Sequence, residues 1–369
     1  MSAKRLHADR AACKPQSKRD PAYEYLSDSS PKDARWDPLK VNSRRMAAAL
    51  VTADDLKARA QRMHGCSDIL TFVLQALRET GEIRFKLEHG SFCRDRMCET
   101  DQMLRSRTWQ KQFRAAAPAL IEKHPGARWL VLTLTIRNPD IHETRNALAE
   151  MNKAWKRLTA RKEFRDVLGW IRATEVTRGG SGKTKGTDKS RVVDNTSHPH
   201  FHILLMVSSR YFEGPRYISQ EKWLKAWQEC MRDDAVTQVD IRAVKPRKGH
   251  SEAADGDGLG WLMAGALEVL KYTSKAADLL PENEQGKAGP GVLNSVSWVQ
   301  ELARQIRGLR FMMTGGVLKD ALKDLDQLSD EELIHAADDE AVDDGDEAGR
   351  VAFGFSAEVK RYRRKRRGV

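Results

Sequence analysis

The sequence predicts an α+β protein whose centre is a mainly antiparallel sheet in the β-α-β-β-α-β order of ferredoxin-like domains. Two observations support this prediction. Between residues 129 and 244, four segments carry the alternating or continuous apolar pattern of strands, and two others carry the spacing of amphipathic helices. Because the chain has 369 residues, it has room for two or three folded units and a substantial core.

The expected elements follow one another in the order that this fold requires. The first strand is the clearest, because Leu130, Leu132 and Leu134 alternate with smaller or polar residues and therefore share one face. A glycine-rich loop at 178–197 joins the second strand to the third. In chain order the elements are a strand at 129–136, a helix that buries Leu148, Met151, Trp155 and Leu158, strands at 168–177 and 198–207, a helix at 219–232 and a strand at 238–244.

Further regions are expected on both sides of this sheet. The spacing of Met46, Leu50 and Met63 predicts helices after a polar N-terminus, and Trp298 and Arg304 make a later segment a candidate for DNA contact. The predicted divisions are a disordered basic N-terminus at 1–45, a helical region with a candidate cysteine metal site at 46–126, the sheet domain at 127–280, a helical, candidate DNA-binding region at 281–323, and a disordered acidic stretch and basic tail at 324–369.

The charge distribution favours a polyanion as partner. The chain has 64 Lys and Arg residues against 52 Asp and Glu residues, a net charge of +12. Residues 324–347 contain twelve of the acids and no Lys or Arg, so the rest of the chain carries +24. Each phosphate that a basic side chain neutralises releases condensed counterions, which favours nucleic acid. For the basic run at 360–367, a merely solvated tail is the alternative.

Neither a membrane span nor secretion is expected. No apolar run reaches the ~18 residues that a membrane helix needs, and the N-terminus has no apolar signal region. The five cysteines are odd in number and scattered, which favours reduced thiols in a cytosol.

The third strand begins with three histidines in five positions, His-Pro-His-Phe-His. Side chains alternate along a strand, so His200 and His202 share one face and can bind one divalent ion. His198 lies on the same face but is a weaker candidate, because the proline after it suits a strand start. Glu175, near the end of the preceding strand, is the expected third ligand. The alternatives are two solvent-facing histidines of an edge strand and an ordinary exposed glutamate.

A helix predicted at 259–277 brings together a second set of side chains. Glu268, Tyr272 and Lys275 are four and three residues apart, so they meet over one patch. Beside a metal ion, Tyr272 could attack a phosphodiester, Lys275 could lower the pKa of its phenol or contact the phosphate, and Glu268 could act as a general base. The alternative is a half-exposed tyrosine flanked by a solvated ion pair.

At these residues the chain resembles the rolling-circle plasmid replication initiators (Rep proteins) of the HUH endonuclease superfamily. The resemblance covers roughly 90–280. Its most specific part is His-Pro-His-Phe-His-Ile-Leu-Leu at 198–205, which looks like the metal motif of the family; Trp-Leu-Val-Leu-Thr-Leu-Thr-Ile at 129–136 looks like its first motif. Glu-Val-Leu-Lys-Tyr-Thr-Ser-Lys at 268–275 looks like the nucleophile motif, with the single tyrosine Tyr272.

This resemblance implies a function for each of these residues. It implies site-specific nicking at a plasmid origin, assisted by Mg²⁺ or Mn²⁺, through attack by Tyr272 that leaves a 5′-phosphotyrosine and a free 3′-OH primer. Strand closure at termination would involve Glu268. The implied partners are plasmid origin DNA, as a single-stranded or cruciform nick site, and the host helicase and replication machinery of a bacterial cytoplasm. A homodimer is left open.

One motif departs from the family pattern. Family members often carry Cys-x-x-Arg-x-Cys-Pro-x-Cys, a plausible structural zinc site, and here Cys93 and Cys98 are kept while Asp101 replaces the last cysteine. Two thiolates and a carboxylate make a weak Zn²⁺ site, which either His89 or Cys66 could complete. Two ordinary buried thiols are the alternative.

Three other functions fit parts of the sequence. A non-catalytic origin- or RNA-binding protein on a ferredoxin-like sheet would explain the basic surface without the tyrosine. A conjugative relaxase or a transposase would share the same chemistry. A zinc hydrolase of small molecules would need further ligands after His202, and residues 203–207 are all apolar.

Overall fold

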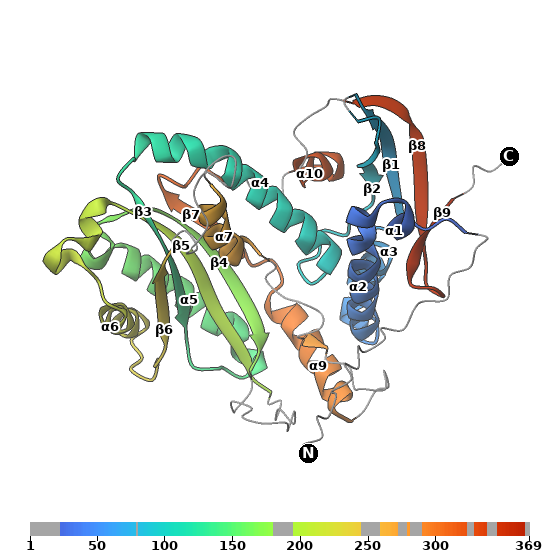
Figure 1. Ribbon diagram of the computed structural model, residues 1–369. Coiled ribbons are helices and arrows are strands. Elements are labelled where there is room, and N and C mark those ends of the chain that lie inside the picture. Colours follow the sequence, from blue (N-terminus) through green and yellow to red (C-terminus); the bar gives the residue numbers. More distant parts are fainter. Residues whose placement is uncertain are drawn as a thin grey trace, which may run out of the picture.

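The computed structural model describes residues 23–78, 80–179, 195–244, 259–271, 279–280, 290–322, 328–337 and 345–365. These residues form two sheets with helices packed around them (Figure 1). The long helix α4 (Glu99–Lys123) runs from one sheet to the other, and α9 (Pro290–Gln305) also lies between them.

The larger sheet has five strands and confirms the predicted fold class. Its strands lie in the order β6-β3-β5-β4-β7, and all neighbouring pairs are antiparallel. Together with α5 and α6, the first four of these strands have the order of a ferredoxin-like sheet. The bounds are β3 (Arg128–Thr135), α5 (Thr144–Thr159), β4 (Val167–Arg178), β5 (Ser197–Val207), α6 (Gln220–Met231), β6 (Val239–Ala243) and β7 (Met312–Gly316).

Helices α5 and α6 cover one face of this sheet with tryptophans. Trp155 of α5 and Trp227 of α6 both pack against Phe201, with ring centroids 6.5 and 6.4 Å apart, and all three side chains are buried. The guanidinium of Arg172 lies 3.9 Å from the centroid of the Phe201 ring, fully buried in the same layer. Because residue 201 points to this side, the flanking histidines at 200 and 202 point to the opposite face.

Helices α4 and α7 (Gly260–Leu270) lie over that opposite face. The hydroxyl of Ser106 in α4 donates to the carbonyl of Leu270, 2.5 Å away. The predicted helix over 259–277 is interrupted, because α7 ends at Leu270 and Lys271 is extended; residues 272–277 lie outside the described part of the chain. Leu262 and Val269 of α7 are buried, whereas Leu267 is 42% exposed.

The smaller sheet has the order β2-β1-β8-β9 and draws on both ends of the described chain. Its helix-facing side is buried through Leu70, Phe72 and Phe353. The remaining bounds are α1 (Leu26–Ser29), α2 (Trp36–Leu50), α3 (Lys57–Gly65), β1 (Ile69–Leu77), β2 (Ile83–Gly90), α10 (Asp330–Ala337), β8 (Gly345–Ser356) and β9 (Arg361–Arg364). Short 3-10 helices are η1 (Pro31–Arg35), η2 (Asp54–Leu56), η3 (Ile141–Glu143), η4 (Lys162–Phe164), η5 (Ser209–Phe212) and η6 (Gly214–Arg216).

This sheet corrects the prediction of helices through 46–126. The spacing of Leu70, Val73 and Leu77 fits a helix, but the segment is part of a central strand paired on both sides. A strand between two neighbours, with both faces partly buried, has a nearly continuous apolar run, and its period cannot be told from that of a buried helix.

The predicted disorder at both ends is also corrected for the described residues. In 1–45, Tyr25 and Trp36 are buried and helices occupy most of the chain after residue 25. In 324–369, α10, β8 and β9 are regular, and Val351, Phe353 and Tyr362 are buried. In 281–323 the helix α9 agrees with the prediction, whereas β7 adds a fifth strand to the larger sheet.

No helix in the described part of the chain is long and apolar enough to cross a membrane.

Candidate metal centres and the face beneath α7

Three side chains from two neighbouring strands converge on the α7 side of the larger sheet. In the pairing of β4 with β5, Glu175 lies opposite His200. His202 is two residues further along β5, so its side chain points to the same face. The Oε2 atom of Glu175 lies 3.1 Å from Nε2 of His200 and 2.8 Å from Nε2 of His202. The structure thus brings together the three residues that the sequence proposed as a metal site.

The hydrogen bonds of His200 determine which ring nitrogen is free to bind a metal. Its Nδ1 lies 3.2 Å from the carbonyl of His198, and a carbonyl can only accept, so Nδ1 carries the hydrogen. In the neutral ring, Nε2 then presents a lone pair to the carboxylate of Glu175. Two electron-rich atoms at this distance require a proton or a cation between them, and a divalent ion fits this donor set.

The electrostatics of Glu175 agree with a cation site. Burial raises the pKa of its carboxyl, but the imidazoles of His200 and His202 beside it outweigh burial and lower that pKa to about 2. Glu175 is therefore a carboxylate at any ordinary pH. Two imidazoles and one carboxylate leave several coordination positions open, as in catalytic rather than structural metal sites.

Neighbouring residues hold these ligands in place. The hydroxyl of Thr133 in β3 lies 3.3 Å from Nδ1 of His202, which orients that ring. Nδ1 of His198 lies 2.7 Å from Oδ1 of Asn138, so this histidine contacts the loop after β3. Among the described residues, His198 is not part of the group whose ligand atoms converge.

The side chain of Glu268 projects from α7 and forms an ion pair with Arg242 of β6. Arg242 also lies 3.3 Å from Asp240, and both residues share the sheet face that carries Thr133 and His202. The predicted nucleophile Tyr272 and Lys275 lie outside the described residues. Helix α7 ends at Leu270 and Lys271 is extended, so the described part of the chain does not test their helical spacing from Glu268.

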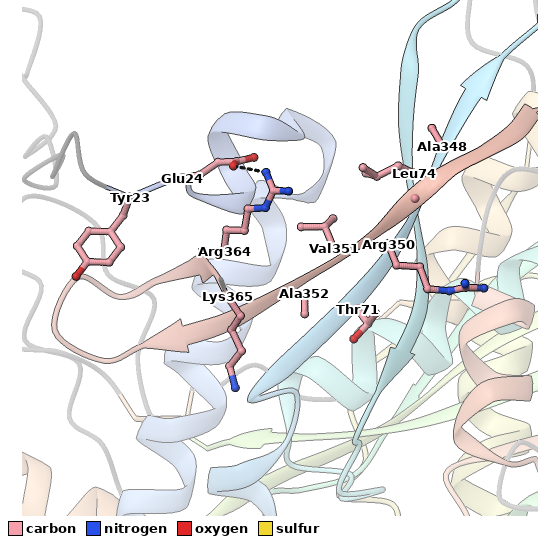
Figure 2. A pocket seen from close by; sticks show the side chains of 11 residues that line it. Tyr23, Glu24, Thr71, Leu74, Ala348, Arg350, Val351, Ala352, Arg364 and Lys365 are labelled. Carbon is pink, nitrogen blue, oxygen red and sulfur yellow. Dashed lines mark hydrogen bonds and ion pairs between the residues drawn. The ribbon is translucent and has the colours of Figure 1, made fainter. Parts of the chain in front are cut away.

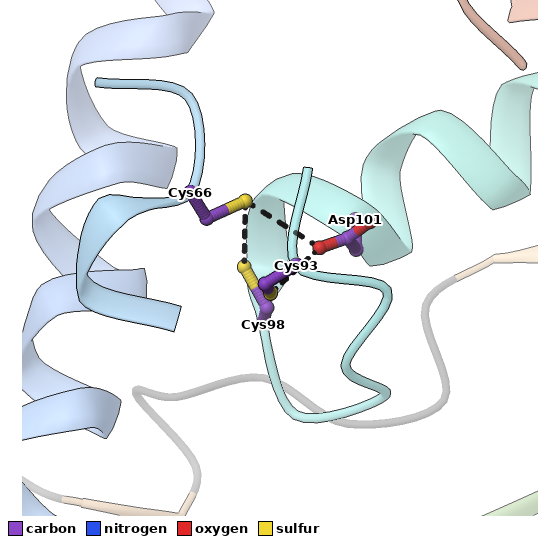
Figure 3. Close-up of side chains that lie close together, drawn as sticks. All are labelled: Cys66, Cys93, Cys98 and Asp101. Carbon is purple, nitrogen blue, oxygen red and sulfur yellow. Dashed lines mark hydrogen bonds between the residues drawn. The ribbon is translucent and has the colours of Figure 1, made fainter. Parts of the chain in front are cut away.

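A second convergence joins three cysteines and an aspartate beside the smaller sheet (Figure 3). Cys66 follows α3, Cys93 lies in the loop after β2, Cys98 caps α4, and Asp101 lies in its first turn. Oδ2 of Asp101 is 2.9 Å from Sγ of Cys93 and 3.4 Å from Sγ of Cys66, and the Sγ atoms of Cys66 and Cys98 are 3.6 Å apart. Of the two proposed fourth ligands, Cys66 rather than His89 belongs to this cluster.

Burial and the neighbouring side chains shift the pKa values of Asp101 and Cys98 in the cysteine cluster. Burial of Asp101, followed by the negative charge of Cys98, raises the pKa of its carboxyl to about 7. Burial raises the pKa of the Cys98 thiol, but hydrogen bonds from Cys66 and Cys93 outweigh burial and lower it well below the ordinary value. A fully buried sulfur whose pKa is lowered, with two further thiols and a carboxyl group beside it, belongs to a donor set suited to Zn²⁺.

Sequence reasoning missed Arg242 and Thr133 as site residues. The sequence carries a signal for both residues, because each alternates with apolar residues of its own strand: Arg242 follows Ile241, and Thr133 lies between Leu132 and Leu134. The alternation places them on a face of the sheet, but only the strand order shows that this is the histidine face.

Comparison with known proteins gives consistent matches. The family model described as Replication protein (Rep_1) matches residues 84–363. "Protein rep" of Streptococcus pneumoniae serotype 2 is 30% identical over 314 residues, covering 84% of this chain and 85% of the relative. "Protein rep" of Lactiplantibacillus plantarum is 28% identical over 310 residues, covering 83% of this chain and 87% of the relative. "Protein rep" of Bacillus amyloliquefaciens is 31% identical over 276 residues, covering 72% of this chain and 73% of the relative. No solved structure matches the chain.

Proposed function

Because the chain belongs to the Rep_1 replication protein family of plasmid replication initiators, we propose that it nicks origin DNA by metal-assisted attack of Tyr272. The observation that carries this proposal is the convergence of His200, His202 and Glu175 on the sheet face beneath the helix that leads to Tyr272. This arrangement supports a single-tyrosine HUH endonuclease.

The proposed chemistry is a transesterification. A divalent ion bound by the two histidines and Glu175 would polarise the scissile phosphate and offset its developing charge. The phenol oxygen of Tyr272 loses its proton and forms a bond to phosphorus, the bond to the 3′ oxygen breaks, and that oxygen takes up a proton. The products are a 5′-phosphotyrosine and a free 3′-OH primer. Because two imidazole ligands suit Mn²⁺ better than Mg²⁺, Mn²⁺ is the preferred ion of the two.

Glu268 and Lys275 would assist different steps. We propose that Lys275 stabilises the phenolate of Tyr272 or contacts the phosphate, and that Glu268 acts as general base for strand closure at termination. The ion pair with Arg242 directs the Glu268 carboxylate toward the sheet face that carries the histidines.

We also propose that Cys66, Cys93, Cys98 and Asp101 bind a structural Zn²⁺. Their positions join α3, the loop after β2 and the start of α4, so the ion would fasten the smaller sheet to the helix that reaches the larger one. Asp101 then takes the place of the last cysteine of the family motif.

The partners follow from the proposed activity. We propose that the protein acts in the bacterial cytoplasm on plasmid origin DNA, as a single-stranded or cruciform nick site, and that the 3′-OH primer passes to the host helicase and replication machinery. A homodimer stays a prediction, which sedimentation of the full chain would test.

The test is nicking of supercoiled DNA from the replicon that carries the gene, with Mn²⁺, with Mg²⁺ and with EDTA. We expect metal-dependent nicked circles, lost in the double variant His200→Ala/His202→Ala and kept in the matched control His64→Ala, whose side chain is exposed. Salt-sensitive binding without nicking in any metal would instead support a non-catalytic origin- or RNA-binding protein. Nicking only at a transfer origin would support a conjugative relaxase.

A further inference from the structure

The smaller sheet has one face that its helices leave uncovered, and basic side chains cross it. Val73 of β1 pairs with Lys86 of β2 on one side and with Arg350 of β8 on the other. Directly paired residues of antiparallel strands point to the same face, so Lys86, Val73 and Arg350 form a row across three strands. The apolar residues Phe72 and Phe353 point to the opposite, helix-covered side.

A hollow of about 1080 Å³ lies on this uncovered face (Figure 2). Small side chains such as Thr71 and Ala352 form its floor, and basic side chains stand around it. Arg350 projects from β8, while Arg364 and Lys365 project from the end of β9 beside it.

The basic groups around the hollow are positioned by short contacts. Arg350 is held by both oxygens of Glu88, at 3.0 and 2.9 Å, and by Oε1 of Glu347 at 2.9 Å, and Nη1 of Arg364 lies 2.6 Å from Glu24. A guanidinium has five N–H donors, so such pairs orient it and leave donors for a ligand. No carboxylate among the described residues pairs with the exposed ammonium of Lys365, and the sequence continues with Arg366 and Arg367.

We propose that this uncovered face binds the sugar-phosphate backbone of duplex DNA. The proposal rests on the proposed function, since that function supplies DNA as the partner. Cations spaced across a shallow surface with a floor of small residues match the repeated phosphates of a duplex. Single strands are usually held by several aromatic platforms, and Tyr23 is the one aromatic side chain among the residues that line this hollow.

The predicted DNA-binding region at 281–323 is a poorer surface for this role. Trp298 of α9 is buried, at 1% exposure, and donates from its indole to the carbonyl of Thr196. Arg304 is engaged by Asp55 at 2.8 Å and by Glu301 at 3.3 Å. These two residues serve the packing of α9 instead of presenting a free surface.

The test compares two double variants of the full chain. Lys86→Gln/Lys365→Gln removes two charges from the uncovered face, and Lys123→Gln/Lys156→Gln removes two exposed charges elsewhere. Binding to a random-sequence duplex is measured over a range of salt concentrations, because phosphate contacts do not depend on sequence. We expect the first variant to bind the duplex about tenfold more weakly. The slope of log affinity against log salt concentration should become less steep by about two, one for each lost phosphate contact, and neither quantity should change in the control.

The other measurements separate this proposal from the proposed function. Nicking of a short single-stranded oligonucleotide that contains the nick site should continue at the wild-type rate in both variants. Equal duplex binding by both variants would overturn the proposal, and so would an equal loss of affinity for single strands and duplex. If the wild-type protein nicks nothing, the proposed function fails, while the duplex-binding comparison still decides the role of this face.

Discussion

Replacing Asp101 by Asn should change stability in opposite directions with and without zinc. In the metal-free protein the carboxyl of Asp101 is fully buried and its pKa is raised to about 7. Since this pKa lies above that of the unfolded chain, the folded state loses stability as the pH rises between about 4 and 7. The side-chain amide of the variant Asp101→Asn cannot ionise, so the variant avoids this loss.

The structure sets the size of both effects. A pKa of about 7 against the ordinary 3.8 corresponds to about 4 kcal/mol at pH 8, an upper figure for the gain in the metal-free variant. The amide can still accept from the Cys93 and Cys66 thiols, which lie 2.9 and 3.4 Å from the carboxylate. With zinc bound, the same change removes a charged ligand; a hundredfold loss of zinc affinity corresponds to about 3 kcal/mol of lost stabilisation.

The assay is urea unfolding at pH 8 of the wild-type chain, of Asp101→Asn and of the exposed control Asp234→Asn, each with EDTA and with Zn²⁺. We expect Asp101→Asn to be more stable than the wild type in EDTA and less stable in Zn²⁺. A change of the same sign in both conditions would refute the zinc assignment. Asp234→Asn should match the wild type in both.

Three other predictions follow from single contacts. Glu175→Gln should weaken binding of Mn²⁺ by at least about tenfold in calorimetry, since it removes the anionic ligand; unchanged affinity would contradict the site. Arg172→Met should stabilise the protein against urea by about 1–3 kcal/mol, because Nε and Nη1 of this fully buried guanidinium have no hydrogen-bond partner among the described residues; a destabilised variant would contradict a net cost of burying the charge. Gly316→Ala should destabilise by roughly 2 kcal/mol or more, because φ is +60° and a Cβ would lie 2.2 Å from the carbonyl oxygen of Leu168; Gly308→Ala, with φ +73° and open space, should cost about 1 kcal/mol. Equal effects of the two glycine changes would contradict the pairing of β7 with β4.

Short-range sequence patterns predicted the larger sheet because each of its first four strands carries its own signal. Leu130, Leu132 and Leu134 alternate over one strand, and the apolar run after His202 marks another. The hairpin between β4 and β5 then determines the register that places Glu175 opposite His200. That part of the candidate site was predictable because it lies within one hairpin.

The parts that sequence reasoning missed depend on contacts between distant segments. β8 pairs with β1, more than 260 residues earlier, and its Gly-rich, acidic surroundings look like a disordered tail when considered alone. Cys66 reaches the cluster of Cys93 and Cys98 because α3 and α4 both pack against α2, which no local spacing encodes. The early end of α7 at Leu270 follows no glycine or proline signal in the sequence.

The proposed reaction links Tyr272 covalently to DNA and needs the histidine site. The most direct measurement is mass spectrometry of peptides from the protein after reaction with supercoiled origin DNA and Mn²⁺, followed by nuclease digestion. We expect a nucleotide-modified peptide that contains Tyr272, absent in Tyr272→Phe, in His200→Ala/His202→Ala and in EDTA. Metal-dependent nicking that leaves Tyr272 unmodified, or that persists in Tyr272→Phe, would contradict the proposed reaction.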